Sequence, residues 1–376
     1  MKIAIVHDWL ISIGGAEKVL KEILNVYPEA DLYCLLDYFK EPERKLILNG
    51  KKAKTSYLQK IPGAKKYYRY MVPFLFRAIE KFDLKDYNLV ISSSHAVAKG
   101  VVTGKDQVHI CYCHTPIRYV WNMKKTYLQQ IPGKARKIAG NQLNRLQKWD
   151  LVTASNVDHY IANSRFVADR ILKNYGKQSK VIHPPVDIDF YHLPEAGDVP
   201  PRPKPYYLIV SRLVHYKRVD LIVEAFNRMP DKNLVVVGEG PQLQDLEKKA
   251  LENISFTGFL KSEEVRQYMQ HADAMVLTAI EDFGITSLES QACGTPVVAF
   301  NFGGYKESVV HEETGVLFNS QTVQSIINGV EAFTIKKDQF DPIQIRSHAL
   351  LFSTERFREY TSEFIRSKIE PSEAFV

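Results

Sequence analysis

The sequence predicts an α/β protein made of two Rossmann-like, doubly wound domains. Three observations lead to this fold class. Residues 1–183 alternate between short apolar runs and amphipathic stretches, the pattern of parallel strands joined by helices. Proline-rich segments follow at 183–185 and 200–205, and the same alternation then starts again at Tyr206. The chain has 376 residues, which is long for one domain and comfortable for two.

The first half supplies five predicted strands and four predicted helices. The strands are short, apolar and bounded by turn residues, at 3–6, 31–36, 89–92, 108–113 and 160–162. The helices have apolar residues at helical spacing, at 16–26, 65–79, 142–155 and 164–174. We assign residues 1–185 to the N-terminal domain.

The second half repeats the alternation after the proline-rich linker. Its predicted strands lie at 206–210, 233–237, 254–256, 274–277 and 297–299, and its helices at 220–228, 242–251, 262–270, 284–292, 323–333 and 354–369. We assign residues 186–353 to the C-terminal domain. In paired sheets of this kind, ligands bind near the carboxyl ends of the strands, so the expected site is the cleft between the two domains.

Composition and charge limit the class of protein. No apolar run approaches the roughly 18–20 residues of a membrane span. The apolar stretch at the start is too short for a signal peptide, so we expect a cytoplasmic protein. Residues 1–185 hold 31 Lys and Arg against 15 Asp and Glu, a net charge of +16, whereas residues 186–376 carry −9. The basic half favours an anionic partner, such as a membrane surface or a phosphorylated acceptor. No nucleic-acid recognition motif is visible.

The stretch from Glu281 to Glu289 carries the clearest chemistry. It lies between two predicted strands, and Gly284 opens a helix. Glu281 precedes that helix, and Glu289 lies beside its apolar stripe with its side chain leaning toward the N-terminus. The free N–H groups of a helix start favour phosphate, and carboxylates suit sugar hydroxyls. The stretch therefore predicts a site for a sugar joined to phosphate.

A basic loop follows the predicted strand 206–210. Arg212 and Lys217 leave the end of this strand, where ligands bind in such sheets. Arg offers a fork of donors and Lys a point charge, and both could stabilise a departing diphosphate. The alternative is a solvated basic loop without a ligand.

Two glycine motifs could let a ligand approach the backbone closely. Gly15, in the Gly14-Gly15 pair, precedes the first helix of its half and could approach a phosphate or a sugar. Gly238 belongs to a Gly-Glu-Gly-Pro turn after a strand. Neither motif is a complete dinucleotide fingerprint, which disfavours a nicotinamide-dependent Rossmann enzyme.

Polar side chains also follow strands in the N-terminal half. His114 comes after the predicted strand 108–113, and His95 follows another strand end. Asp8 and Trp9 follow the first strand. These residues predict a polar cleft face that could bond sugar hydroxyls, on the acceptor side. For a lone histidine, the alternative is a structural imidazole bonded to backbone.

Neither a metal nor a cofactor is expected. Asp187 and Asp189 imitate an Asp-x-Asp metal motif, but they lie in the proline-rich crossover instead of at the end of a central strand. A divalent ion would also need further oxygen ligands nearby. The spacing of the four cysteines matches neither a zinc site nor a redox pair, so buried free thiols are expected.

Residues 65–77 are basic and aromatic. This segment could lie at a lipid headgroup interface, or it could be a core-facing helix with a solvated basic side. Both interpretations stay open at this point.

Several of these motifs together resemble the signature of retaining family-4 glycosyltransferases with the GT-B fold. They are Glu281–Ala299 with its two glutamates, Gly14–Val19, Ser211–Lys217 and Val235–Pro241. Their spacing covers nearly the whole chain. The segment Cys113–Tyr119 resembles a bacterial subgroup, often labelled mannosyltransferases, that builds surface polysaccharides.

The resemblance implies a role for each motif residue. Arg212 and Lys217 would hold the donor diphosphate, Glu281 the hydroxyls of the donor sugar, and His114 the transferred sugar; these four are the candidate catalytic residues. The candidate donor-binding residues are Gly15, Phe283, Gly284, Ile285, Glu289, Phe259, Leu260 and Gly238. Among them, Glu289 would bind the ribose, the amides of Phe283 to Ile285 the phosphate and sugar, and Phe259 and Leu260 would frame the base.

The resemblance also bears on the ends of the second domain. Residues 183–187 resemble the interdomain crossover of the family, which argues against a metal at Asp187. The last helix, predicted at 354–369 within a C-terminal segment 354–376, would cross back to the N-terminal domain.

The expected function is metal-independent, retaining transfer of a hexose from a nucleotide-diphosphate sugar, UDP-glucose or GDP-mannose. The expected acceptor is a saccharide or a polyprenyl-linked oligosaccharide in polysaccharide biosynthesis, reached by a cytoplasmic protein at the inner face of the plasma membrane. One alternative is a nucleotide-sugar epimerase of similar two-lobed shape, which would process the donor without an acceptor. Another is a non-catalytic module that binds sugar or lipid, which should lack the complete phosphate-binding set.

Overall fold

A computed structural model describes residues 1–68, 71–129, 131–203 and 205–369. The chain divides into two compact units. The N-terminal unit contains residues 1–184 together with the segment from Phe357 onward, and the C-terminal unit contains residues 185–356. Three predicted segments reach beyond the described residues: the basic aromatic stretch includes Arg69 and Tyr70, the proline-rich linker includes Lys204, and the C-terminal segment 354–376 includes residues 370–376.

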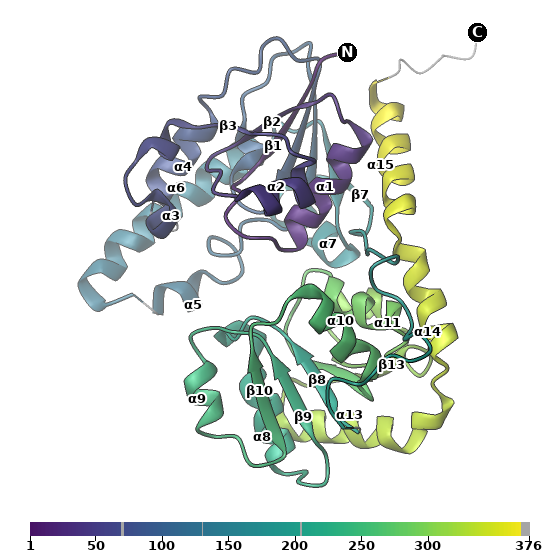
Figure 1. The fold of residues 1–376 in the computed structure, drawn as a ribbon. Coiled ribbons are helices and arrows are strands. Elements are labelled where there is room, and N and C mark those ends of the chain that lie inside the picture. Colours follow the sequence, from purple (N-terminus) through teal and green to yellow (C-terminus); the bar gives the residue numbers. More distant parts are fainter. Residues whose placement is uncertain (69–70, 130, 204, 370–376) are drawn as a thin grey trace. The chain divides into compact units, whose positions relative to one another are not determined.

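The N-terminal unit contains a parallel sheet of seven strands in the order β3-β2-β1-β4-β5-β6-β7 (Figure 1). The strands are β1 (Ile3–His7), β2 (Asp31–Cys34), β3 (Lys54–Thr55), β4 (Leu89–Ser94), β5 (Val108–Cys113), β6 (His159–Ala162) and β7 (Ser179–Val181). The two outermost strands, β3 and β7, are additions to the predicted set. Both are short edge strands that carry few apolar residues, so periodicity does not reveal them.

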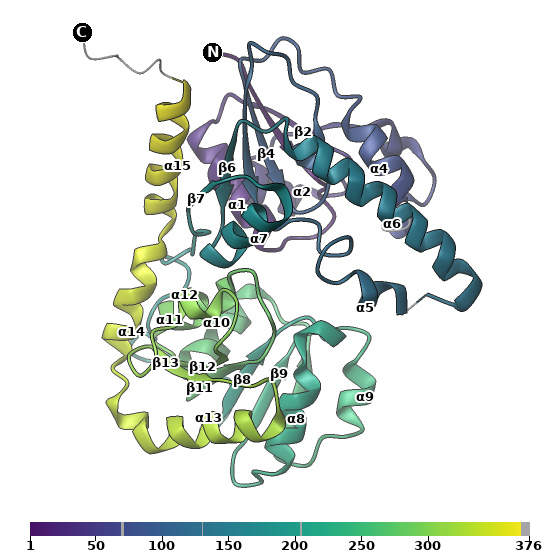
Figure 2. The same cartoon turned by 180° about the vertical axis from the view of Figure 1, so that it is seen from behind.

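Helices cover both faces of this sheet. They are α1 (Gly15–Val26), α2 (Glu41–Leu48), α3 (Ala64–Tyr67), α4 (Val72–Ile79), α5 (Lys124–Gln129), α6 (Gly133–Ala154) and α7 (Arg165–Tyr175). On one face, Ile5 and Ile91 pack against α1 and α2. On the other face, Val6 and Val90 pack against α4 and α6, which Figure 2 shows from behind. Successive residues of a strand point to opposite faces of the sheet. Because helices cover both faces, runs such as 3–6 are apolar throughout.

The predicted helix over 65–79 is wrong in one respect. The structure has two separate helices there, α3 and α4, and Pro73 lies in the first turn of α4. A proline has no N–H to donate, so it is tolerated at a helix start and disfavoured in a helix interior. The helix predicted at 142–155 is correct but begins nine residues earlier, at Gly133.

The C-terminal unit contains a parallel sheet of six strands in the order β10-β9-β8-β11-β12-β13. The strands are β8 (Tyr207–Val210), β9 (Leu234–Val237), β10 (Ile254–Gly258), β11 (Ala274–Leu277), β12 (Val297–Phe300) and β13 (Gly315–Phe318). Only β13 was not predicted. A Cβ atom on Gly315 would overlap the backbone of Val297, so the glycine permits β13 to pair with β12.

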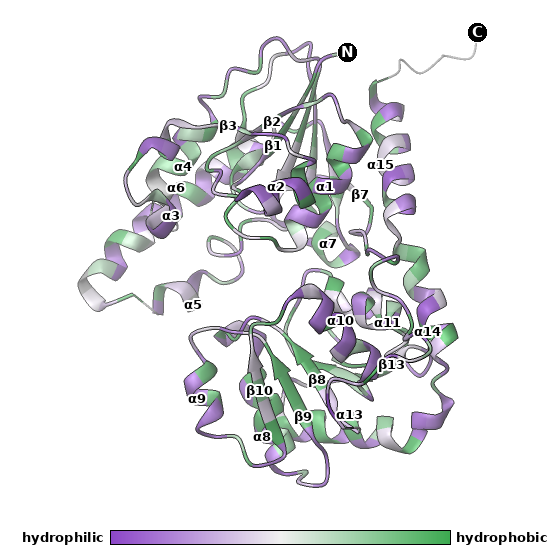
Figure 3. Ribbon diagram, in the orientation of Figure 1, coloured by the Kyte–Doolittle hydropathy of each residue, from purple (hydrophilic) through white to green (hydrophobic). Residues whose placement is uncertain are grey.

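The helices of this unit also cover both sheet faces. They are α8 (Val219–Asn227), α9 (Leu243–Glu247), α10 (Ser262–His271), α11 (Ile285–Ala292), α12 (Tyr305–Ser308), α13 (Val323–Lys336) and α14 (Pro342–Ala349). Ile209 and Val236 pack against α8 and α13, whereas Leu208 and Val235 share a cluster with α10 and α11. Both sheets are therefore covered on two faces, and central strands such as β8 and β9 are green, or apolar, in Figure 3.

The last described helix, α15 (Thr354–Ile369), belongs to the N-terminal unit from Phe357 onward. Phe357 and Ile365 lie in the same core cluster as α1 and the sheet. Arg358 Nε donates to the buried carboxylate of Glu22 on α1 at 2.6 Å. The predicted return of the chain to the first domain is therefore confirmed. Among the described residues, no helix has both the length and the apolar character that a membrane span requires. The four cysteines are free and buried, as expected.

Candidate functional site

In each sheet the strand order reverses at one point, and polar loops leave the carboxyl ends of the strands there. The reversal lies between β1 and β4 in the N-terminal unit and between β8 and β11 in the C-terminal unit. Open α/β sheets bind ligands outside such a switch point, because the two neighbouring loops separate there. Arg212 and Lys217 follow β8, and Glu281 follows β11. The structure thus brings the predicted diphosphate and sugar residues to one switch point.

An ion pair between Lys217 Nζ and Glu281 Oε1 joins these two loops. Lys217 ends a short 3₁₀ turn, His215–Lys217, and the following residue, Arg218, has φ of +53°. The side chains are 22% and 14% exposed, so the pair is accessible. Arg212 lies at the surface, and its guanidinium donates to Tyr216 Oη at 3.0 Å. Two cations therefore follow β8, and one of them, Lys217, pairs with the carboxylate that follows β11.

The loop that carries Glu281 is packed against a second loop that sequence reasoning missed. Gly303 and Gly304 follow β12, and Gly304 N–H donates to the Glu281 carbonyl at 2.9 Å. A Cβ atom on either glycine would overlap the backbone of residues 281–283. The available signal was the position of this Gly-Gly pair, which lies between a strand and a helix as Gly14-Gly15 does.

Gly284 caps the start of α11 with φ of +89°. A side chain at this position would be strained and would also meet the Tyr305 ring. Burial and the nearby Glu281 charge hold the pKa of Tyr305 well above its ordinary value. The Phe283 side chain lies in the core beside Phe352, with 5.7 Å between ring centroids. Phe283 is thus placed so that its backbone, and not its ring, could serve a ligand.

Glu289 lies one helical turn further along α11 and is buried. Tyr191, which is buried as well, shares a hydrogen bond with its carboxylate. Burial raises the pKa of Tyr191, and the Glu289 charge raises it further, so the phenol keeps its proton and donates. Burial also raises the pKa of the Cys293 thiol, to about 12. Glu289 is therefore a carboxylate held in place by Tyr191, which the sequence did not single out.

The remaining predicted donor residues fall into two groups. Gly238 has φ of +137°, and a Cβ atom there would overlap the Ser211 carbonyl, so the glycine lets the two loops pack closely. Phe259 and Leu260 follow β10, at the far edge of the sheet from β13. Phe259 is 72% exposed, whereas Leu260 packs against the core. An exposed aromatic ring at a strand end is available to stack on a planar ligand.

The N-terminal unit places His114 in a chain of hydrogen bonds. His114 Nε2 lies 2.8 Å from Ser93 Oγ, and His7 Nδ1 lies 3.1 Å from the same hydroxyl. His7 Nε2 faces Glu17 Oε1 at 3.5 Å. All four side chains are buried. Burial lowers the pKa of His114 well below its ordinary value, and the neighbouring His95 and His7 lower it further, so the imidazole is neutral.

Asp8 holds the loop that carries His95. Its two carboxylate oxygens accept the backbone N–H groups of residues 95–98, at 2.6–3.0 Å, and its side chain is fully buried. His95 Nδ1 also lies 3.1 Å from Asp8 Oδ2. Trp9 packs edge-on against His95, with 4.9 Å between ring centroids. Within the predicted acceptor-side set, Asp8 thus has a structural role, and Trp9 and His95 lie next to each other.

Gly15 is the first residue of α1, and Gly14 is its N-cap. The Gly14 N–H donates to Glu17 Oε2 at 2.8 Å. This bond ties the glycine pair to the same carboxylate that faces His7. The sequence predicted the glycines but not the role of Glu17.

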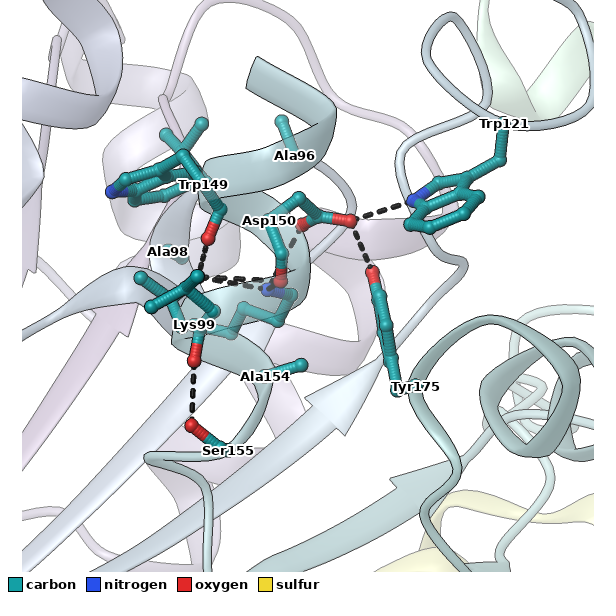
Figure 4. A network of polar contacts seen from close by, with 12 residues as sticks. Ala96, Ala98, Lys99, Trp121, Trp149, Asp150, Ala154, Ser155 and Tyr175 are labelled. Carbon is teal, nitrogen blue, oxygen red and sulfur yellow. Dashed lines mark hydrogen bonds and ion pairs between the residues drawn. The ribbon is translucent and has the colours of Figure 1, made fainter. Parts of the chain in front are cut away.

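A buried ion pair lies next to this region and was also missed (Figure 4). Lys99 Nζ lies 2.9 Å from Asp150 Oδ1, and both side chains are almost fully buried. Trp121 Nε1 and Tyr175 Oη each donate to Asp150 Oδ2 at 2.7 Å. Lys99 follows the His95 loop, and Trp121 follows the His114 loop. The network therefore ties the segments after β4 and β5 to α6 and α7.

The described residues hold no group of three or more His, Cys, Asp or Glu side chains arranged for a metal ion. Asp187 Oδ1 accepts the Phe190 N–H at 3.0 Å, which closes a local turn in the crossover. The motif at 187–189 therefore has a backbone role at its first aspartate.

Comparison with known proteins follows the same division of the chain. The family model described as Glycosyltransferase Family 4 matches residues 13–190, and the model described as Glycosyl transferases group 1 matches residues 197–341. Together the two matches span most of the chain.

Curated relatives include a GDP-mannose-dependent alpha-(1-6)-phosphatidylinositol monomannoside mannosyltransferase of Mycolicibacterium smegmatis. It is 29% identical over 44% of this chain and 50% of its own length. Its counterpart in Mycobacterium tuberculosis is 31% identical over 36% of this chain and 40% of its own length. The chain thus spans half or less of the length of these two relatives.

Among solved structures, the Anabaena protein HepE in complex with UDP and glucose superposes with a TM-score of 0.71 at 19% identity. The match covers 98% of this chain and 100% of the other. At this identity, the likeness shows the fold.

Proposed function

Because the chain belongs to the family-4 glycosyltransferases with the GT-B fold, we propose that it transfers a hexose from a nucleotide-diphosphate sugar to an acceptor hydroxyl. The observation that carries this proposal is the Lys217–Glu281 pair at the switch point of the C-terminal unit. It joins a cation for a diphosphate to a carboxylate for sugar hydroxyls. Arg212 adds a second cation on the same loop.

Each group in this unit has a task in the proposed reaction. The bond between the sugar and the diphosphate breaks, and negative charge develops on the departing phosphate. Lys217 and Arg212 stabilise that charge, and the backbone of residues 283–285 supports the phosphate and the sugar. Glu281 accepts hydrogen bonds from the sugar hydroxyls, and Glu289, oriented by Tyr191, accepts those of the ribose. Positioning and charge stabilisation are the main contributions of the protein.

The proposed transfer retains the configuration of the sugar and needs neither a metal nor a cofactor. The two cationic side chains supply the counter-charge that a divalent ion would otherwise provide. A transfer assay that measures product with and without chelator tests whether the reaction needs a metal. Activity that vanishes with chelator and returns with manganese would contradict it.

The donor is of the UDP-glucose or GDP-mannose type. The mycobacterial relatives are named as GDP-mannose-dependent, which supports the GDP-mannose type. HepE is solved in complex with UDP and glucose, which supports the UDP-glucose type. A thermal-shift panel of UDP, GDP and ADP tests the donor class, since a ligand that binds the native state raises its stability. We expect one of the first two to stabilise the protein selectively. Equal shifts with all three, or none, would count against the proposal.

The acceptor is a saccharide or a polyprenyl-linked oligosaccharide, reached at an anionic membrane surface from the cytoplasm. Residues 44–79 and 107–149 together hold 18 Lys and Arg and no Asp or Glu. Helices α3, α4, α5 and α6 of these segments share one apolar cluster, in which Phe76 on α4 contacts Trp149 on α6 at 5.6 Å between ring centroids. Exposed apolar side chains accompany the charge on these elements, at Tyr67, Phe74, Tyr127 and Ile138. Cations beside exposed aromatics are typical of lipid-surface contacts.

Vesicle sedimentation tests the membrane contact. We expect binding to vesicles that contain phosphatidylglycerol and little binding to pure phosphatidylcholine. Each lysine near an anionic surface contributes about 1 kcal/mol, so the K65A/K66A double variant should bind about thirtyfold more weakly. K173A/K180A, an equal change of charge at exposed lysines outside these segments, should bind as the wild type does. Equal losses in both double variants would contradict the proposed face.

Incubation of the donor without an acceptor separates transfer from its main alternative. An epimerase converts the donor under these conditions. The proposed transferase releases nucleotide diphosphate at a rate that rises strongly when acceptor is added. Conversion of the donor sugar without acceptor would favour the epimerase.

A further inference from the structure

We propose that Glu17, His7 and Ser93 form a directed hydrogen-bond chain that fixes the proton of His114 on Nε2, so that His114 Nδ1 accepts a hydroxyl of the bound sugar. The three residues are positioning residues, since they act through His114. The inference rests on the proposed function only in the identity of the ligand. The direction of the chain follows from the contacts of the N-terminal unit alone.

The carboxylate of Glu17 sets the direction. A carboxylate only accepts hydrogen bonds. Its Oε2 accepts from Gly14 N–H at 2.8 Å, and its Oε1 faces His7 Nε2 at 3.5 Å. Burial alone would raise the pKa of Glu17, but the hydrogen bond with His7 and the other contacts of the carboxylate outweigh burial, so the net pKa lies below its ordinary value. The ionised carboxylate therefore selects the form of His7 that carries a proton on Nε2.

In a neutral imidazole one ring nitrogen donates and the other accepts, so His7 Nδ1 is then an acceptor. Ser93 Oγ lies 3.1 Å from this Nδ1 and 2.8 Å from His114 Nε2. A hydroxyl has one proton, so Ser93 donates to His7 and must accept from His114. The proton of His114 consequently lies on Nε2.

His114 Nδ1 is left with a lone pair. Within the described parts of the chain, no side chain forms a hydrogen bond with this nitrogen. Burial keeps the imidazole neutral by lowering its pKa, and the rings of His95 and His7 lower it further. The His95 ring, which contacts the His114 ring, faces Asp8, and the Asp8 carboxylate already accepts backbone N–H groups. His114 therefore offers an acceptor, which suits a sugar hydroxyl and not a phosphate oxygen.

The isosteric variant E17Q should reverse the whole chain. Gly14 N–H still needs an acceptor, so the amide oxygen takes that place and the amide nitrogen faces His7. An amide nitrogen only donates. His7 Nε2 must then accept, its proton moves to Nδ1, Ser93 accepts from His7 and donates to His114, and the proton of His114 moves to Nδ1. The variant thus turns the acceptor of His114 into a donor without changing side-chain size.

The test is a two-bond proton–nitrogen correlation spectrum of free protein labelled with ¹⁵N-histidine, which reports the tautomer of each ring. The variant H114N assigns the signal among the 11 histidines. We expect the Nε2–H tautomer in wild type and the Nδ1–H tautomer in E17Q. E22Q is the matched control, because Glu22 is buried on the same helix but bonds Arg358, and its His114 signal should equal that of wild type.

An Nδ1–H or cationic His114 in wild type overturns the proposal, as does an E17Q spectrum equal to that of wild type. If E17Q does not fold, S93A replaces it; an unchanged single Nε2–H tautomer in S93A also overturns the proposal. In the transfer assay, loss of one oriented acceptor should lower kcat of E17Q about tenfold or more, with E22Q unaffected. The tautomer is read without donor or acceptor, so a failure of glycosyl transfer in wild type leaves the spectrum interpretable.

Discussion

The two switch points of this protein treat their charged groups in opposite ways. In the N-terminal unit, charges and imidazoles are buried, and they are bonded to one another or to backbone, as Asp8, Glu17 and the Lys99–Asp150 pair show. In the C-terminal unit, Lys217, Glu281 and Arg212 are partly or fully accessible. The first arrangement holds loops in one conformation, and the second leaves charge available to a ligand.

This difference in burial predicts a difference in what happens when an ion pair is broken. Removing one partner of a buried ion pair leaves an uncompensated charge in a medium of low polarity, which is costly. An accessible pair contributes little to stability because water solvates each partner alone. Substitution in the buried Lys99–Asp150 pair should therefore act first on stability, and substitution in the accessible Lys217–Glu281 pair first on turnover.

The largest effect is expected for Asp150→Asn. It leaves the Lys99 ammonium buried without its counter-charge, so the free energy of unfolding should fall by about 3–5 kcal/mol. Urea denaturation followed by tryptophan fluorescence measures this change. The double variant Lys99→Met, Asp150→Asn removes the charge as well and should recover part of the loss. A stable Asp150→Asn protein would remove the contrast between the two units.

Lys217→Ala should act on turnover. Loss of one oriented charge donor lowers kcat roughly tenfold to a thousandfold. Because the pair is accessible, the free energy of unfolding should change by less than about 1 kcal/mol. Lys232→Ala is the control: Lys232 pairs with Glu331 at 3.0 Å and precedes β9, at the opposite ends of the strands. Full activity in folded Lys217→Ala would end the diphosphate role.

The variants Gly304→Ala and Gly14→Ala compare the glycine pairs of the two units. In Gly304→Ala the Cβ would overlap the backbone of Phe283, so the loop bearing Glu281 must move, at a cost of about 1–3 kcal/mol. The apparent Kd for the stabilising nucleotide should rise, as calorimetry would show. In Gly14→Ala the Cβ meets only the flexible end of Glu17, at 3.1 Å, and nucleotide affinity should stay unchanged. Equal affinities in both variants would contradict the role of the Gly303-Gly304 loop.

The smallest effect concerns acid stability. Burial lowers the pKa of His109 to about 4 from an ordinary value of 6.5, and Ser92 Oγ bonds its Nε2 at 2.8 Å. The unfolded chain takes up a proton near pH 6.5, while the native state resists until about pH 4. Stability is therefore present at neutral pH and lost as the pH falls through this window, by about 1 kcal/mol at pH 5.5.

His109→Gln should remove that part of the pH dependence. Unfolding free energies of variant and wild type, compared at pH 7 and pH 5.5, measure it. The C-terminal unit offers a control in His311→Gln, because His311 is exposed and its substitution should leave the pH dependence unchanged. An identical pH dependence in wild type and His109→Gln would contradict the burial argument.

The periodicity of the sequence predicted most of the sheet strands and the main helices. Their apolar runs are local, and strands buried on two faces cannot tolerate polar interruption. The elements that escaped prediction, β3, β7, β13, α2, α5, α12 and α14, are short or lie at edges, where a few residues carry too little pattern. The break between α3 and α4 was readable at Pro73, whose missing N–H marks a helix start.

By itself, the sequence determined which chemical groups follow which strands: Arg212 and Lys217 after β8, Glu281 after β11, His114 after β5. Only the tertiary structure decided which groups meet. The packing of helices and loops around the sheets places Glu17 against His7, Lys99 against Asp150, and the Gly303-Gly304 loop against Glu281. The last two contacts join residues more than twenty positions apart, and local periodicity does not encode them. Burial then sets how costly it is to leave a charge without a partner, because that cost depends on its surroundings.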